Sequence, residues 1–358
     1  MGDEHPGSPL ARYLLLAYAL LVVYASLHPF SGWTAAGVDA FSFVSAPLPR
    51  RVLRFDVFSN VLGYVPLGFL AVLALYPWRR ARAVAAAGAG AIALSFLMET
   101  LQNYLPSRTP SNVDFAANSA GAMAGALLAA FSAERLLHER GLKLLRHRVF
   151  RGGRRIDAGL VLLGLWLLLQ IDPQSLLFGA GDLRELFQDA AAELHPAEVF
   201  IRAEALVGGA NAVAIGLLIA LLGAPGQPLR RLYVGLVLAA LVVRALAFGV
   251  FFGTEDALNW LTPGAYFGVA SGALLVLAAM ALPRPVQLVL CALALMAGAV
   301  VVNIAPANPY LMESLSNWRH GYFEHFIGLT RFLSAVWPFL ALVYVVSLAS
   351  QREGARPL

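Results

Sequence analysis

Three short segments of the chain place polar side chains in pairs, at spacings that bring each pair to one face of a helix. The pairs are Asp56 with Asn60, Glu99 with Gln102, and Asp114 with Asn118. Carboxylates accept hydrogen bonds and bind amines or cations, and amides both donate and accept hydrogen bonds. These residue types suit the recognition of a polar ligand, and a carboxylate could also act as a general base.

A turn between the second and third pairs adds a basic side chain, Arg108. Pro106 and Pro110 restrict the backbone on either side of it, so we expect Arg108 to lie beside the carboxylates. A guanidinium group can bind a phosphate or a carboxylate through two parallel hydrogen bonds. The sequence therefore predicts one ligand-binding group, here called the polar cluster, made of Asp56, Asn60, Glu99, Gln102, Arg108, Asp114 and Asn118.

Two other interpretations of these residues stay open. In hydrolysis or group transfer, Glu99 or Asp114 would be the general base and Arg108 would stabilise negative charge. The cluster holds no His or Cys, so the pattern favours a non-enzymatic function and identifies no catalytic residue, cofactor or metal ligand. In a purely structural role, the pairs would bond one another and hold the helices in register, because polar groups in lipid need partners.

The elements that must position the cluster are predicted membrane spans. Hydrophobic residues make up 59% of the chain and charged residues 13%, which is typical of a polytopic membrane protein. An apolar run of about 20 residues crosses a bilayer. We predict an all-α fold of about ten transmembrane helices, near residues 10–30, 55–76, 82–102, 113–132, 156–171, 199–222, 231–252, 263–282, 285–303 and 324–348.

Lys and Arg residues set the predicted orientation, because cytoplasmic loops of membrane proteins are enriched in them. A cytoplasmic N-terminus places most of the basic residues on inner loops, including Arg79, Arg80 and the segment 133–155. We therefore predict a multi-pass protein of the inner (plasma) membrane with both termini cytoplasmic and the polar cluster at the outer face. With this topology, the basic residues behind the net charge of +5 lie mostly beside the anionic lipid head groups of the inner leaflet. The lipid bilayer, and not nucleic acid, is therefore the expected partner.

The polar residues recur in a recognisable order. The pattern reads Asp56-x3-Asn60-x5-Pro66-Leu67-Gly68, then Glu99-x2-Gln102, then Ser107-Arg108, then Asp114-x3-Asn118-x2-Gly121-x3-Gly125. It resembles the VanZ-like membrane proteins, named after a factor that raises resistance to the glycopeptide teicoplanin, and the resemblance covers roughly residues 10–131. It implies a four-helix integral membrane domain of the cell envelope and an effect on teicoplanin susceptibility, but no mechanism.

The charge pattern suggests three regions. We predict a VanZ-like four-helix membrane domain at 10–132, a basic cytoplasmic linker at 133–155, and a six-helix membrane domain of unknown type at 156–348. The linker is either solvated or a helix lying along the inner leaflet. The acidic outer loop 172–198 is expected to contain a short helix, which either connects two spans or covers a cavity.

Two features of the later spans have alternative interpretations. Residues 268–275, GVASGALL, echo residues 121–128, GAMAGALL, which indicates either close packing at small residues or a parallel repeat of spans two to four in spans six to eight. Glu204 and Arg244 are expected to form a structural pair, with a transport path as the alternative.

The predicted function is the binding or handling of an envelope amphiphile at the outer leaflet. A lipid-linked envelope precursor or an anionic phospholipid would suit the polar cluster, with its tail between the helices. The alternatives are a membrane scaffold for wall or polysaccharide assembly and a lipid-modifying enzyme.

Overall fold

The computed structural model describes residues 9–34, 37, 39–48, 54–76, 78, 80–137, 146, 148–184, 195–306 and 324–350. In these residues the regular elements are helices, apart from one isolated β-bridge between Phe150 and Gly223. Eight of the helices are long and apolar enough to cross a membrane. The fold is therefore that of an all-helical polytopic membrane protein, as the sequence predicts. The chain divides into two compact units, residues 1–148 with 322–329 and residues 149–321 with 330–358.

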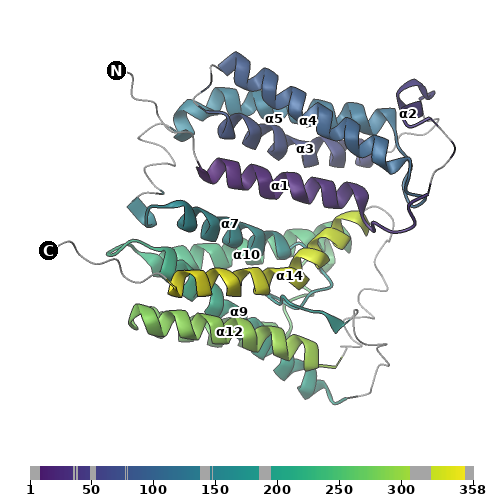
Figure 1. The fold of residues 1–358 in the computed structure, drawn as a ribbon. Coiled ribbons are helices and arrows are strands. Elements are labelled where there is room, and N and C mark those ends of the chain that lie inside the picture. Colours follow the sequence, from purple (N-terminus) through teal and green to yellow (C-terminus); the bar gives the residue numbers. More distant parts are fainter. Residues whose placement is uncertain are drawn as a thin grey trace, which may run out of the picture. The chain divides into compact units, whose positions relative to one another are not determined.

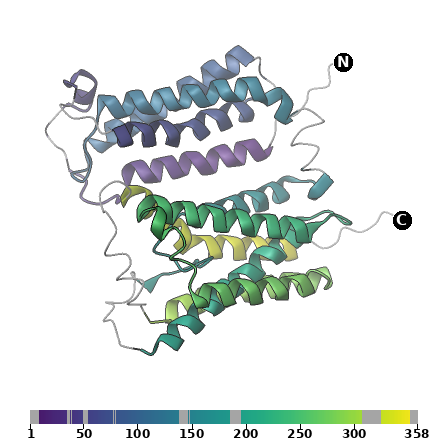
Figure 2. The same ribbon diagram turned by 180° about the vertical axis from the view of Figure 1, so that it is seen from behind.

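The first unit is a helical bundle (Figures 1 and 2). Its helices are α1 (Pro9–Leu27), α2 (Ser42–Ser45), α3 (Arg54–Ala74), α4 (Arg80–Gln102) and α5 (Asn112–Leu137). Helix α3 packs against α1, α4 and α5. Because successive long helices run in opposite directions, α1 and α4 end where α3 and α5 begin. This end of the bundle, here called the polar end, carries the residues of the polar cluster.

Glycines bring α3 and α5 into direct backbone contact. A Cβ atom added to Gly121 would lie 2.2 Å from the Val61 carbonyl oxygen, and one added to Gly125 would lie 1.9 Å from that of Val65. Gly68 on α3 faces α5 in the same way, at 1.9 Å from the Ala122 oxygen. Any side chain at these positions would separate the helices. The predicted close packing at the small residues of 121–128 is thus confirmed.

The second unit is organised around α9 (Ala197–Leu222), which is largely buried and packs against α7, α10, α11 and α12. The other helices are α7 (Arg154–Leu169), α10 (Leu229–Phe251), α11 (Pro263–Ala279), α12 (Arg284–Ile304) and α14 (Glu324–Ala349). Helix α14 is joined to α7 by a 2.9 Å hydrogen bond from Trp337 Nε1 to the Leu162 oxygen. The predicted spans 156–171 and 263–282 correspond to α7, with 16 residues, and α11, with 17 residues. Both are shorter than the eight helices that are long enough to cross a membrane.

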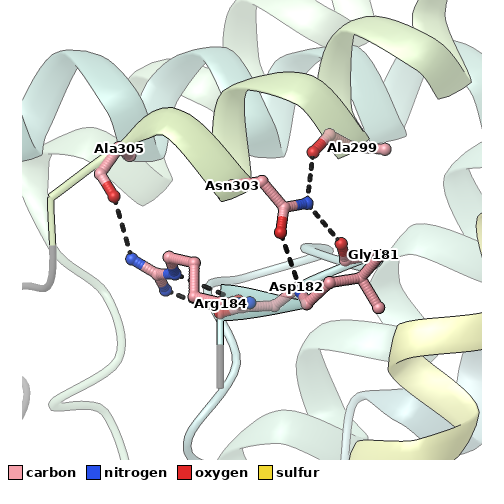
Figure 3. Close-up of polar contacts among 7 residues, drawn as sticks. Gly181, Asp182, Arg184, Ala299, Asn303 and Ala305 are labelled. Atoms are coloured by element: carbon pink, nitrogen blue, oxygen red, sulfur yellow. Dashed lines mark hydrogen bonds and ion pairs between the residues drawn. The ribbon is translucent and has the colours of Figure 1, made fainter. Parts of the chain in front are cut away.

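A non-helical segment, residues 170–184, follows α7. Its residues 177–181 are almost completely buried. Figure 3 shows how its end is held: Asn303 of α12 donates to the oxygens of Gly181 (2.6 Å) and Ala299 (2.7 Å) and accepts from the Leu183 N–H. Non-helical backbone is tolerated at membrane depth only where protein or a cavity covers it. The packing of this segment meets that condition.

Arg184 forms a paired contact with Asp182 at the end of this segment and donates to the Ala305 oxygen (Figure 3). The short helix predicted within 172–198 falls mainly on residues 185–194, which lie outside the described residues, as do most positions of the inner-leaflet helix considered for the linker.

Candidate functional site

The polar end of the first unit joins the first and third predicted pairs. Asn60 Nδ2 on α3 donates a 2.8 Å hydrogen bond to Asp114 Oδ1 on α5. Asp114 also interacts electrostatically with Asp56, which lies one turn before Asn60. The two pairs predicted from spacing therefore meet across the α3–α5 contact that the glycines make possible.

The side chain of Glu99, which belongs to α4, lies beside the first residues of α5. Its side chain is 3% exposed, and its Oε2 atom accepts a 2.9 Å hydrogen bond from the Ser111 N–H. Ser111 caps the helix, because its hydroxyl accepts from the N–H groups of Val113 and Asp114. Glu99 interacts electrostatically with Asp114 and Arg108. A carboxylate is favoured here, since the N-terminus of a helix carries partial positive charge.

A second layer of polar side chains lies deeper in the bundle. Asn118 Nδ2 donates a 3.1 Å hydrogen bond to Ser95 Oγ, and both residues are buried. Another buried atom of this layer, Asn118 Oδ1, has no hydrogen-bond partner, and the Tyr64 hydroxyl interacts with Ser95 and Ser26. Asn118 and Tyr64 are each only 6% exposed. An unsatisfied buried polar atom costs about 1–3 kcal/mol, so Asn118 Oδ1 favours a ligand or water there.

Tyr64 and Ser95 were not predicted as members of the site. The signal was present in the spacing, because each lies four residues from a cluster residue on its own helix and so shares its face. A tyrosine and a serine inside apolar runs are common in membrane helices, however, and neither stood out by residue type.

The side chains of Arg108 and Gln102 donate their hydrogen bonds to backbone oxygens at the end of α1, and not to the other side chains of the polar cluster. Arg108 Nε donates to the His28 oxygen (3.1 Å) and its Nη2 to the Ala25 oxygen (2.6 Å). Gln102 Nε2 donates to the Ser26 oxygen at 2.9 Å. These bonds satisfy carbonyls at the end of α1 that have no partner within the helix. They occupy two of the five N–H groups of Arg108, which leaves three for another acceptor.

Electrostatic shifts accompany this arrangement. Burial lowers the pKa of Arg108 to about 10, although Glu99 opposes the shift, so the guanidinium remains charged at neutral pH. Burial and the nearby Arg108 charge both lower the pKa of His28. The polar cluster thus holds three carboxylates and one arginine. Among the described residues, no three His, Cys, Asp or Glu side chains are grouped so as to hold a metal ion.

The second unit has a separate charged group around Arg244 of α10, which is 2% exposed. Arg244 donates to the oxygens of Asp172 and Ser175 in the non-helical segment, and its guanidinium lies 5.0 Å from the ring centroid of Phe248. Its Nε atom is buried without a partner. The Asp172 carboxyl accepts a 3.0 Å hydrogen bond from the Gln174 N–H and interacts electrostatically with Arg244.

Glu204 completes this Arg244 group. The expected pairing of Glu204 with Arg244 is electrostatic, since the carboxylate takes its 2.5 Å hydrogen bond from the Thr262 hydroxyl instead. Thr262 in turn caps α11, accepting from the Ala265 N–H. The predicted structural pair is thus part of a larger group that joins α9, α10, α11 and the non-helical segment.

Residues 12–133 match the model of the VanZ/LLP1 family. The N-terminal third of the chain is therefore similar to the VanZ/LLP1 family, and residues 12–133 are called the VanZ domain below. The match includes the whole polar cluster and ends before the second unit. No curated protein and no solved structure matches the chain. The VanZ domain and the apolar helices make this an integral membrane protein.

Proposed function

We propose that the VanZ domain recognises the polar head group of an envelope amphiphile at the outer leaflet of the plasma membrane. The observation that carries the proposal is the buried Asn118 Oδ1 atom, which has no hydrogen-bond partner and lies one turn along α5 from Asp114. Polar groups inside a membrane domain are costly unless they are paired or used. A head group that donates a hydrogen bond would satisfy this atom.

The charge of the cluster supports a head group with an ammonium group. Asp56, Glu99 and Asp114 form a run of carboxylates within electrostatic reach of one another, and Arg108 is the one cation of the cluster. An ammonium carries three donors and no acceptor, which matches carboxylate, amide and hydroxyl oxygens. The three N–H groups left on Arg108 suit a phosphate or carboxylate of the same head group. A zwitterionic lipid or an amine-bearing lipid-linked wall precursor combines these groups.

Binding to a lipid panel tests the proposal. The purified full-length protein in nanodiscs would be offered lipids with identical tails and either an aminophosphate, a phosphate or an uncharged head. We expect the aminophosphate lipid to bind best, and Asp114→Asn to weaken it roughly ten- to hundredfold, the range for a lost charged hydrogen bond. Asp39→Asn, at an exposed position, is the matched control. Equal binding of all three lipids would refute head-group recognition.

A membrane scaffold is the second candidate, because Arg108 and Gln102 are engaged by backbone carbonyls of α1. The two candidates differ in Arg108→Ala. Head-group recognition predicts that this variant accumulates in the membrane but no longer alters teicoplanin susceptibility. A scaffold predicts that the variant alters susceptibility as much as the wild type does. A lipid-modifying enzyme would instead show turnover of a lipid that disappears in Glu99→Gln.

A further inference from the structure

The α9–α11 pair of the second unit repeats the contact geometry of α3 and α5. On α5, two glycines four residues apart face two α3 carbonyls that are also four residues apart. On α11, a Cβ added to Gly268 would lie 2.7 Å from the Ala205 oxygen, and one added to Gly272 would lie 2.8 Å from that of Gly209. The intervening helices, α4 and α10, both have 23 residues. Packing at small residues alone does not require this shared register.

A polar contact recurs at nearly the same position. Asn60 directly precedes the first α3 residue contacted by glycine, and it binds Asp114 near the start of α5. Glu204 directly precedes the corresponding residue of α9, and it binds Thr262, one residue after the position equivalent to Asp114. Two glycine contacts and the position of Glu204 therefore align α3–α5 with α9–α11, which supports the parallel repeat over mere resemblance of the two glycine-rich segments.

This register shows what replaces the polar cluster in the second unit. Counting back from the aligned glycines, Asp114 corresponds to Leu261 and Asn118 to Ala265. Both replacements are apolar, and both line a cavity of about 230 Å³. Other lining residues are Leu177, Leu241, Trp260 and Val269. An apolar cavity thus occupies the position at which the VanZ domain carries its polar side chains.

Arg244 is not itself a lining residue, but it lies close along the chain to one lining residue and binds a neighbour of another. It lies one turn from Leu241 on α10, and it binds Ser175, which is two residues from Leu177. Its buried Nε–H has no acceptor. Arg244, Arg331 and Asp182 act on Asp172, and Asp172 and Glu204 act on Arg244. Arg244 therefore already has acidic partners, and a neutral oxygen would satisfy its free N–H without adding a further buried charge.

We propose that the second unit holds a lipid site of its own, in which an acyl chain of a membrane glycerolipid fills the cavity and its ester carbonyl accepts the Nε–H of Arg244. The site is the apolar counterpart of the polar cluster in a second copy of the same three-helix arrangement. It does not depend on what the VanZ domain binds.

Photolabelling of the full-length protein in nanodiscs tests the site. The probe is a diacyl phospholipid with a diazirine in one acyl chain, used with its ether-linked analogue, which lacks the carbonyl. We expect labelled peptides to include 172–184 and the cavity-lining parts of α10 and α11. Because one hydrogen bond is lost, the ether analogue should label them roughly two- to tenfold less. Equal labelling by the two probes would overturn the carbonyl contact.

Filling the cavity gives the matched comparison. Ala270→Trp places a large side chain at the exposed rim of the cavity, and Leu274→Trp places it one turn further along α11, at a residue that is 70% exposed. Labelling of the cavity peptides should be lost in Ala270→Trp and kept in Leu274→Trp, with both variants monodisperse on gel filtration. Equal labelling of the two variants would overturn the proposal, as would labelling spread evenly over all lipid-facing helices.

Discussion

The two charged groups of the molecule use their arginines differently. In the VanZ domain, half-buried Arg108 holds the end of α1, while three carboxylates and the buried, unpartnered Asn118 Oδ1 atom belong to the same polar cluster. In the second unit, fully buried Arg244 holds a non-helical segment and is balanced by acids. The same glycine-mediated helix contact underlies both. On the two proposals above, a shared scaffold would fix where a site lies, and the side chains that line it would decide whether it takes a head group or a chain.

Replacing each arginine by methionine should give the largest difference between the regions. Arg244→Met leaves Glu204 without its cation and Asp172 with Arg331 alone, and removing one partner of a buried charged group typically costs about 3–5 kcal/mol. Arg108→Met loses two hydrogen bonds in a half-buried position, which we expect to cost about 1–2 kcal/mol. Thermal unfolding in a single detergent, followed by circular dichroism, measures both variants. A similar loss for the two would contradict the distinction between a structural and a ligand-facing cation.

Enlarging a glycine should disrupt the shared scaffold with an intermediate effect. Gly125→Leu forces α3 and α5 apart, and we expect a destabilisation of about 3 kcal/mol or the loss of folded protein. Gly90→Leu on α4 is the control, because nothing lies within 4 Å of a Cβ there. Gly272→Leu should behave like Gly125→Leu if α9–α11 repeats α3–α5. Normal stability of Gly272→Leu would count against the repeat.

Asn118→Leu should separate binding from stability. The substitution removes one hydrogen bond to Ser95 but also removes the unpartnered Oδ1 atom, so the unfolding free energy should change by less than about 1 kcal/mol. Binding of the aminophosphate lipid should nevertheless fall. If Asn118 only holds helices together, stability will drop and binding by the surviving folded protein will be unchanged.

The smallest expected effect is a pH dependence at the polar end. Because the folded protein lowers the pKa of His28 below its ordinary value of 6.5, folding favours the neutral ring. This contribution to stability is present above pH 6.5 and is lost as the pH falls from that value through the lowered pKa of the folded protein. The melting temperature of the wild type should therefore fall slightly more between pH 7.5 and 5.5 than that of His28→Gln. Identical pH profiles would show that His28 does not titrate in this range.

Most of the helical framework was predictable, because long apolar runs bounded by charge leave few alternatives in a membrane. Helix α9 begins at Ala197 and ends at Leu222, against a predicted span of 199–222. The convergence of Asp114 with Asn60 followed from spacing and topology. The partners of Arg108 and Gln102 did not, since backbone carbonyls of a distant helix leave no trace in residue types.

The non-helical segment was hidden for a related reason. Residues 177–181 are buried by α-helical neighbours far along the chain, and their own composition resembles a loop. Asn303, which holds the end of the segment, is one polar residue near the end of an apolar helix. Long-range packing determines such features, and a local pattern cannot express it.

That segment also bears on the order in which the protein is made. Its Gly181 N–H donates to the Ser334 oxygen of α14, and its other anchors lie on α10 and α12. Ribosomes synthesise it before any of those three helices, so its full set of anchors can form only after α14 has been made. A chain that stops short of α14 would leave the Gly181 N–H without its partner.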